Sequence, residues 1–179
     1  MADYIKIPED RIGVLIGKDG RTKKDIEESA EVSLEIDSET GSVAVEKTGD
    51  PIKALKGPEI VKAIARGFPP EVALKLLDDD MMMYESINIK KATSSDSEMR
   101  EKKGRLIGRD GRTRELMEEL TGADVRIYGK TFGVIGSPEQ VEIVMTAAEM
   151  LLQGASHGTV YSYMERKRNE LQRSRMEYY

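Results

Sequence analysis

The chain has no cysteine and no tryptophan, and it has one histidine among its 179 residues. The absence of cysteine excludes disulfide bonds and thiolate metal sites. No apolar run approaches the ~18 residues of a membrane-spanning helix, and the first residues lack the apolar core of a secretory signal. Because no set of catalytic or metal-binding side chains can be assembled, we expect no metal, no cofactor and no active site. We therefore expect a cytoplasmic protein that contacts no membrane and is not an enzyme.

Charged residues make up 34% of the chain, and they are distributed unevenly along it. The net charge of −5 argues against a uniformly basic nucleic-acid binder. Residues 11–24 nevertheless hold five cations and one acid, and residues 100–114 hold seven cations and two acids. Residues 25–50, in contrast, hold nine acids and one cation. Two local positive fields can attract a polyanion while the protein as a whole stays acidic.

Both basic segments contain the same short motif. The sequence LIGKDGRT at residues 15–22 recurs 91 residues later as LIGRDGRT at residues 106–113, so that only Lys18 and Arg109 differ. A repeat this long indicates a copied domain and not a solenoid unit of ~20–50 residues. Each copy contains Gly-x-x-Gly, and glycines without side chains let the backbone approach a phosphate closely and offer its N–H groups.

The apolar periodicity around each motif predicts the same order of elements: strand, short helix, Gly loop, helix, strand, strand and helix. In the first copy we expect them at 4–7, 11–16, 17–20, 21–30, 32–36, 43–45 and, interrupted at Gly57, 51–66. In the second copy we expect them at 86–89, 95–104, 108–111, 113–120, 124–128, 131–135 and 139–153. A short helix at 71–77 joins the copies, a further helix covers 159–179, and Ser95 and Glu98 predict a capping box. The expected domain boundaries are 1–67, 68–83, 84–155 and 156–179.

Asp19 and Asp110 lie inside the two loops, where a carboxylate would repel phosphate. We expect them to act as N-cap residues for the following helices, in preference to contacting bases. The spacing of Gly13, Gly17 and Lys18 also hints at a nucleotide-binding P-loop. It is one residue too short, however, and Asp19 stands where a metal-binding Ser or Thr belongs. A nucleotide-dependent enzyme is therefore the least favoured interpretation.

This order of elements, with Leu-Ile-Gly-x-x-Gly-Arg-Thr at its centre, resembles a KH domain of the type I arrangement. The resemblance implies an α+β fold of two tandem type I KH domains (βααββα), each a three-stranded antiparallel sheet packed on helices, plus a linker helix and a C-terminal helix. It also implies that each loop clamps about four nucleotides of single-stranded RNA. The bases would lie on an apolar groove beside Ile16 or Ile107 and the strands at 32–36 or 123–127. The expected RNA-binding residues are Gly17, Lys18, Asp19, Gly20, Arg21, Lys24, Lys103, Arg105, Gly108, Arg109, Asp110, Gly111, Arg112, Arg114 and Arg126.

One family is similar in more detail, through residues 103–114, 118–123 and 128–131 and through the linker at 65–80. It is the archaeal two-KH ribosome-assembly (pre-rRNA processing) factor, counterpart of the eukaryotic partner of the Nob endonuclease. The resemblance implies binding near the 3′ end of small-subunit ribosomal RNA. It also implies contact with the rRNA-maturation endonuclease and with the alpha subunit of initiation factor two. We expect the second copy to bind RNA more strongly, because its loop has more cations nearby.

Two alternatives stay open at this point. One is a general chaperone for single-stranded RNA or DNA, without ribosomal specificity. The other is an assembly scaffold, in which one groove or the acidic segment 25–50 holds a protein. For the C-terminal helix, a solvated packing role is favoured over an extension of the RNA surface, because Val160, Met164 and Leu171 lie near one face.

Overall fold

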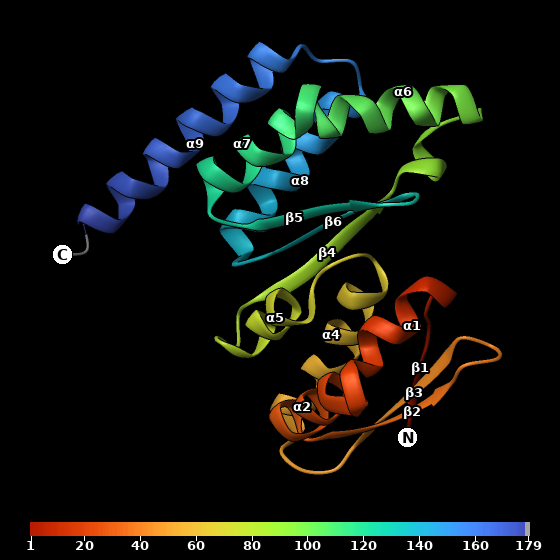
Figure 1. Ribbon diagram of the computed structural model, residues 1–179. Helices are drawn as coiled ribbons and strands as arrows, with labels where there is room; N and C mark the ends of the chain where they lie inside the picture. Colours follow the sequence, from red (N-terminus) through yellow and green to blue (C-terminus); the bar gives the residue numbers. More distant parts are fainter. Residues whose placement is uncertain (178–179) are drawn as a thin grey trace. The chain divides into compact units, whose positions relative to one another are not determined.

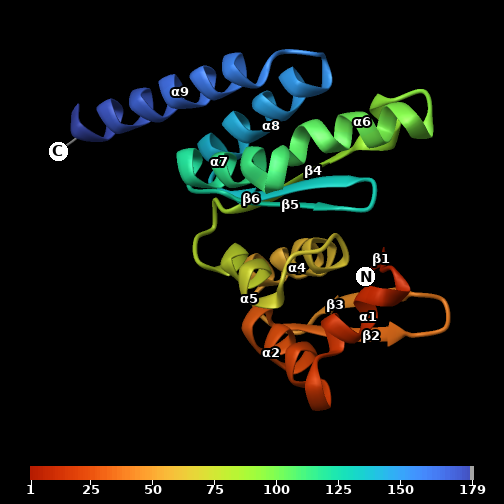
Figure 2. The same ribbon diagram turned by 45° about the horizontal axis from the view of Figure 1, so that its top comes forward.

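The computed structural model describes residues 1–177, and residue contacts divide the chain into two units, one of Met1–Tyr84 and one that begins at Glu85. Each unit contains one three-stranded antiparallel sheet, in the order β1-β3-β2 in the first and β4-β6-β5 in the second. Helices cover one face of each sheet (Figure 1, Figure 2). The expected α+β fold with two βααββα units is confirmed. Within the described residues, no helix is both long and apolar enough to cross a bilayer.

The first unit follows the predicted order, with a turn of 3-10 helix inside the Gly loop. Its strands are β1 (Asp3–Lys6), β2 (Val32–Asp37) and β3 (Ser42–Lys47). Its helices are α1 (Glu9–Ile16), α2 (Arg21–Ala30), α3 (Pro51–Ala54), α4 (Lys56–Ala65) and α5 (Pro70–Ala73), with 3-10 helices at Lys18–Gly20 and Leu74–Leu77. The linker helix expected at 71–77 is therefore a short α-helix that continues as a 3-10 helix.

The second unit repeats this order and adds one long helix. Its strands are β4 (Met83–Asn88), which spans the boundary, β5 (Asp124–Tyr128) and β6 (Thr131–Gly136). Its helices are α6 (Asp96–Ile107), α7 (Arg112–Thr121), α8 (Pro138–Leu152) and α9 (His157–Glu177), with 3-10 helices at Ile89–Ala92 and Arg109–Gly111. The sequence predicts that the C-terminal helix runs to residue 179, and residues 178–179 lie outside the described part of the chain.

The core of each unit lies between its sheet and its helices. In the first unit Leu34 of β2 stands opposite Val45 of β3, and both side chains are buried. In the second unit Val125 stands opposite Val134, and both have no exposed surface. Burying such side chains stabilises each by about 1.5–3 kcal/mol. The alternation of buried and exposed residues along β2 is the pattern that predicted this strand from the sequence.

In each unit the helix before the Gly loop is fastened to the end of the last helix of the βααββα unit. Arg11 in α1 donates from Nε to the carbonyl of Ile64, at 2.9 Å, and from Nη2 to the carbonyl of Phe68, also at 2.9 Å. These carbonyls belong to the C-terminal end of α4 and the turn after it, where four helical carbonyls lack intrahelical partners. The cation therefore adds a charged donor at the end of α4 and in the turn after it, and sets the position of α1.

In the second unit, two cations connect the helix before the Gly loop to the end of α8. Lys102 in α6 donates to the carbonyl of Leu152, and the guanidinium of Arg105 donates to the carbonyls of Leu151 and Ala155. These carbonyls lie at the end of α8 and in the turn after it. Lys102 corresponds to Arg11 in the repeat, while Arg105 adds a contact that the first unit lacks.

Helix caps account for several of the predicted helix starts. Ser137 and Gln140 form a full capping box at α8. The box predicted from Ser95 and Glu98 is half formed: Ser95 Oγ accepts from the Glu98 N–H at 3.1 Å, but the Glu98 carboxylate accepts from Ser94. Those hydrogen bonds, from the hydroxyl and then the N–H of Ser94, lower the pKa of Glu98.

A substitution of Arg11 tests the fastening of α1 in the first unit. We expect Arg11→Met to lower the unfolding free energy by about 1–3 kcal/mol, because carbonyls of two buried residues lose a charged donor. Hydrogen exchange at the α4 amides measures this change. Arg66→Met, at an exposed side chain next to the same helix end, is the matched control. Equal exchange rates in the two variants would contradict the structural role of Arg11.

Candidate nucleic-acid interface

The first glycine of each motif ends the preceding helix and turns the chain sharply. Gly17 has φ 75° and ψ 175°, and Gly108 has φ 79° and ψ 171°, a region that is essentially restricted to glycine. A Cβ on Gly17 would also lie 2.2 Å from Oγ1 of Thr22. A Cβ on Gly108 would lie at the same distance from Oγ1 of Thr113. Backbone angle and packing therefore both require glycine here.

The second glycine of each motif stands in open space. Gly20 has φ 73° and ψ 13°, and Gly111 has φ 76° and ψ 12°, so both are left-handed. A Cβ on either would have no atom within 4 Å. Local packing therefore does not exclude a side chain at this position. The bare backbone instead leaves room for another molecule to approach the loop closely.

The N-cap role expected for Asp19 and Asp110 is wrong. The N-caps of α2 and α7 are Gly20 and Gly111, and no side chain caps either helix. Asp19 has φ 56° and Asp110 has φ 54°, so each aspartate is itself left-handed. Aspartate is one of the few residues other than glycine that visit this conformation. The backbone of the loop, and not a cap, accounts for aspartate at this position.

The uncapped starts of α2 and α7 give each loop an anion-binding character. The first N–H groups of a helix have no intrahelical carbonyl partner, and they carry its partial positive charge. The N–H groups of Arg21 and Arg112 donate to the carbonyls of Lys18 and Arg109 inside the loops. Those of the next two residues, Thr22 and Lys23 or Thr113 and Arg114, have no capping side chain and lie beside the loop. Such helix starts favour phosphate or carboxylate ligands.

Five of the predicted RNA-binding cations form no ion pair with the described residues. Lys18 and Arg109 are exposed, and within residues 1–177 neither has an acidic partner. The same holds for the exposed Arg21 and Arg126 and for the half-buried Lys103. These five side chains can meet a polyanion without first breaking an internal ion pair.

Two further cations are held only loosely. Lys24 lies 4.0 Å from Glu28, and both side chains are largely exposed. Arg112 lies 3.8 Å from Glu115 and 3.6 Å from Glu119. Exposed pairs of this kind contribute little to stability, so a phosphate can compete with these carboxylates.

Arg114 and Arg105, in contrast, form hydrogen bonds within the protein. Arg114 pairs with Glu118 at 2.6 Å, and the other carboxylate oxygen of Glu118 accepts from the N–H of Val125 at 3.1 Å. This link between α7 and β5 has a counterpart in the first unit, where Glu27 pairs with Lys23 and accepts from the N–H of Leu34. Arg105 donates to the end of α8 and to the turn after it. A role for either arginine in RNA binding stays a prediction.

The sequence alone did not indicate that α9 holds the helices on both sides of the second loop. Thr113 is 1% exposed, and its hydroxyl lies 2.8 Å from the hydroxyl of Tyr161. His157 Nε2 lies 3.0 Å from the carbonyl of Arg105. The helices on both sides of the loop are thus held by the first turns of α9, which packs on α7 and α8. The apolar residues Val160 and Met164 had indicated that this helix packs on the domain, but neither they nor the single histidine indicated its contacts behind the loop.

The expected apolar groove is narrower than the sequence suggested. In β2 and β5, Leu34 and Val125 are buried in the core and cannot meet a base. Ile16 and Ile107, which end the helices before the loops, are half-buried and keep some accessible apolar surface. Within residues 1–177, no group of three or more His, Cys, Asp or Glu side chains is placed to hold a metal ion.

Family models match both units of the chain. Residues 3–62 match the KH domain, and residues 83–169 match the eukaryotic type KH-domain, KH-domain type I. Each unit is therefore a KH domain, in which the Gly-x-x-Gly loop lies between the first two helices.

Proteins of similar sequence indicate which KH-domain proteins this chain is related to. A KH domain-containing protein of Methanocaldococcus jannaschii is 47% identical over 178 residues, which cover 98% of this chain and 78% of the relative. The pre-rRNA-processing protein pno1 of Emericella nidulans is 29% identical over 113 residues, which cover 62% of this chain and 44% of that protein.

Solved structures agree with the sequence relatives. The crystal structure of Dim2p from Pyrococcus horikoshii is 47% identical with a TM-score of 0.86, and the match covers 93% of this chain and 99% of that one. A chain in the a/eIF2alpha–aDim2p–rRNA complex of the same organism is 46% identical with a TM-score of 0.88, over 95% of both chains. This chain belongs to the family of two-KH-domain proteins that includes Dim2p and pno1, as the sequence predicted.

Substitution by alanine at the two glycines of the second loop should destabilise the protein by different amounts. We expect Gly111→Ala to lower the unfolding free energy by about 1–2 kcal/mol, the cost of a left-handed alanine. Gly108→Ala should cost about 3 kcal/mol or more, because its Cβ would also lie 2.6 Å from the backbone nitrogen of Thr113. Urea unfolding of the two variants side by side measures the difference. Equal destabilisation would show that the packing against Thr113 does not constrain the loop.

Proposed function

We propose that this protein binds single-stranded RNA without catalysing a reaction and acts in the maturation of small-subunit ribosomal RNA. In this proposal both Gly-x-x-Gly loops grip the RNA backbone, near the 3′ end of that RNA. One observation carries it: both loops combine an open second glycine, an uncapped helix start and a cation without an acidic partner among the described residues. The two copies have nearly the same backbone angles, which indicates one shared task.

The chemistry of the grip is that of a phosphate beside a bare backbone. A phosphate that approaches Gly20 or Gly111 meets N–H donors of the following helix and the charge of Lys18 or Arg109. Each hydrogen bond to a charged group contributes about 1.5–3 kcal/mol. Such contacts position the strand but read no sequence. Base edges and faces would be met by the accessible surface beside Ile16 and Ile107.

The relatives support the ribosomal part of the proposal. The pno1 relative is a pre-rRNA-processing protein, and aDim2p was solved in a complex with a/eIF2alpha and rRNA. We extend both properties to this chain: ribosomal RNA as the ligand and the alpha subunit of initiation factor two as a partner. Contact with the rRNA-maturation endonuclease belongs to the same proposal.

Within this proposal the second domain is the stronger grip. Among the described residues, Arg109 of its loop and the additional Lys103 have no acidic partner. Its flanking helices are also held by Tyr161 and His157 of α9, a helix that the first unit lacks. A loop that is held in place before binding loses less conformational entropy when RNA binds.

Neutral substitutions of the loop cations test the grip. We expect Lys18→Gln and Arg109→Gln each to weaken binding of single-stranded RNA about tenfold or more, because each removes a charged group that meets a phosphate. The slope of log affinity against log salt should fall by about 0.7 for each phosphate that is no longer neutralised. Fluorescence anisotropy at several salt concentrations gives both quantities.

Lys62→Gln, at an exposed residue of α4, is the control for the removed charge. The thermal melts of all variants should stay near that of the unchanged protein, since neither loop cation has an ion pair within the described residues. Full affinity in the double variant Lys18→Gln, Arg109→Gln would defeat the proposed grip.

Crosslinking in cells tests the ribosomal assignment separately. We expect crosslinks of the second loop to concentrate near the 3′ end of small-subunit ribosomal RNA and to disappear in the double variant. Crosslinks scattered over messenger RNAs would favour a general chaperone instead. If initiation factor two alpha and the endonuclease still bind the double variant, they use a separate protein surface; if they do not, RNA mediates the contact.

A further inference from the structure

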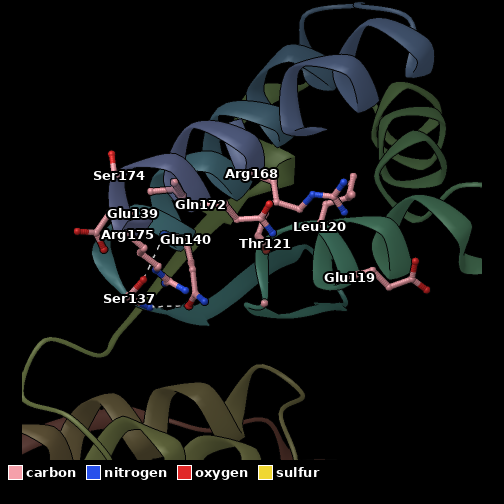
Figure 3. A pocket seen from close by; sticks show the side chains of 12 residues that line it. Glu119, Leu120, Thr121, Ser137, Glu139, Gln140, Arg168, Gln172, Ser174 and Arg175 are labelled. Atoms are coloured by element: carbon pink, nitrogen blue, oxygen red, sulfur yellow. Dashed lines mark hydrogen bonds between the residues drawn. The ribbon is translucent and has the colours of Figure 1, made fainter. Parts of the chain in front are cut away.

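The second domain has a cleft at the end of α7, the end opposite to its Gly loop. The cleft has a volume of about 460 Å³ and lies between the last turn of α7, the start of α8 and the second half of α9 (Figure 3). The residues that line it are Glu119, Leu120, Thr121, Gly122, Ser137, Glu139, Gln140, Arg168, Leu171, Gln172, Ser174 and Arg175. The KH motif of the sequence does not include it.

Two arginines of α9 line this cleft. Neither Arg168 nor Arg175 has an acidic partner within residues 1–177. The Nε atom of Arg168 is moreover shielded from solvent and makes no hydrogen bond within those residues. Nε is closed to a ligand as it is to water, so an acceptor in the cleft would meet the outer nitrogens of this guanidinium, which form no hydrogen bond within those residues.

The lining also includes two carboxylates, Glu119 and Glu139, and the side-chain amide of Gln140. The Glu119 carboxylate lies 3.6 Å from Arg112, and Figure 3 shows that the side chains of Glu119 and Glu139 point away from Ser137 and Gln140. Gln140 accepts from the N–H of Ser137 through Oε1, at 2.9 Å, so its amide NH₂ is left as a donor. The cleft therefore presents guanidinium and amide donors, which suit a phosphate.

The placement of the cleft relates it to the RNA grip. Helix α7 begins directly after Gly111 and ends at Thr121, and ten helical residues span about 15 Å. A strand held by the loop at the start of α7 therefore needs only a short further length to reach the cleft. The first unit has no helix that corresponds to α9, so this contact would be particular to the second domain.

Building on the RNA binding proposed above, we propose that this cleft is a second phosphate site, which binds the same RNA strand beyond the nucleotides that the second loop grips. Arg168 and Arg175 supply the charge and the guanidinium donors. The site lengthens the RNA footprint of the second domain.

The test compares RNAs of two lengths with matched variants of the full chain. The double variant Arg168→Gln, Arg175→Gln should bind a four-nucleotide RNA as the unchanged protein does, because a strand of about that length fills only the loop site. It should bind a twelve-nucleotide RNA about tenfold more weakly, with a salt slope lower by about 0.7 for each phosphate that the cleft no longer neutralises. Arg173→Gln, at an exposed residue of α9 outside the cleft, should match the unchanged protein on both RNAs.

The outcomes separate this inference from the proposed function. If the double arginine variant and Arg173→Gln bind the longer RNA equally, the phosphate site is overturned, even where Lys18→Gln, Arg109→Gln abolishes binding. If the arginine variant keeps its RNA affinity but no longer binds poly-glutamate, the cleft takes protein carboxylates and the inference also fails. Should the double glutamine variant melt early, Arg175→Gln alone, at an exposed residue of the cleft, takes its place; unchanged affinity for the longer RNA then counts against the site.

Discussion

Each Gly-x-x-Gly loop depends on a turn that any side chain would block. Gly17 and Gly108 hold backbone angles open only to glycine, and each packs against the threonine five residues later. This turn brings the next aspartate and the second glycine into left-handed conformations, and the following helix then begins without a cap. The free N–H groups that suit a phosphate are therefore a consequence of the turn. This dependence explains why the motif repeats almost unchanged.

A second constraint holds the helices on either side of that turn. Arg11 anchors the helix before the first loop to the end of α4, and Lys102 with Arg105 does the same for α6 and α8. On the other side, Glu27 and Glu118 tie the following helices to the neighbouring strands. The anchoring side chains differ between the two units although they contact carbonyls at the same helix end, because any cation of sufficient reach can bind these carbonyls.

The sequence predicted the elements well because their signals are local. Alternation along β2 and the glycine at the end of α7 depend only on neighbouring residues. The wrong cap assigned to Asp19 arose because a helix start and a left-handed turn both favour aspartate, and only the backbone angle tells them apart. The contact between Thr113 and Tyr161 joins residues 48 positions apart, and no local pattern reports such a pair. The same holds for Arg105, whose charge suggested RNA and whose partners are carbonyls.

The helix α9 makes the two domains unequal although their motifs are nearly identical. Its first turns contact Thr113 and the carbonyl of Arg105, while its second half lines the cleft with Arg168 and Arg175. One added helix thus reaches both ends of α7. In the proposed binding mode, a loop that is already held in place costs less to order, and a second contact on the same strand makes release slower, because both must open together. Asymmetry between two copied loops therefore needs no change in the loops themselves, only a neighbour that one copy has and the other lacks.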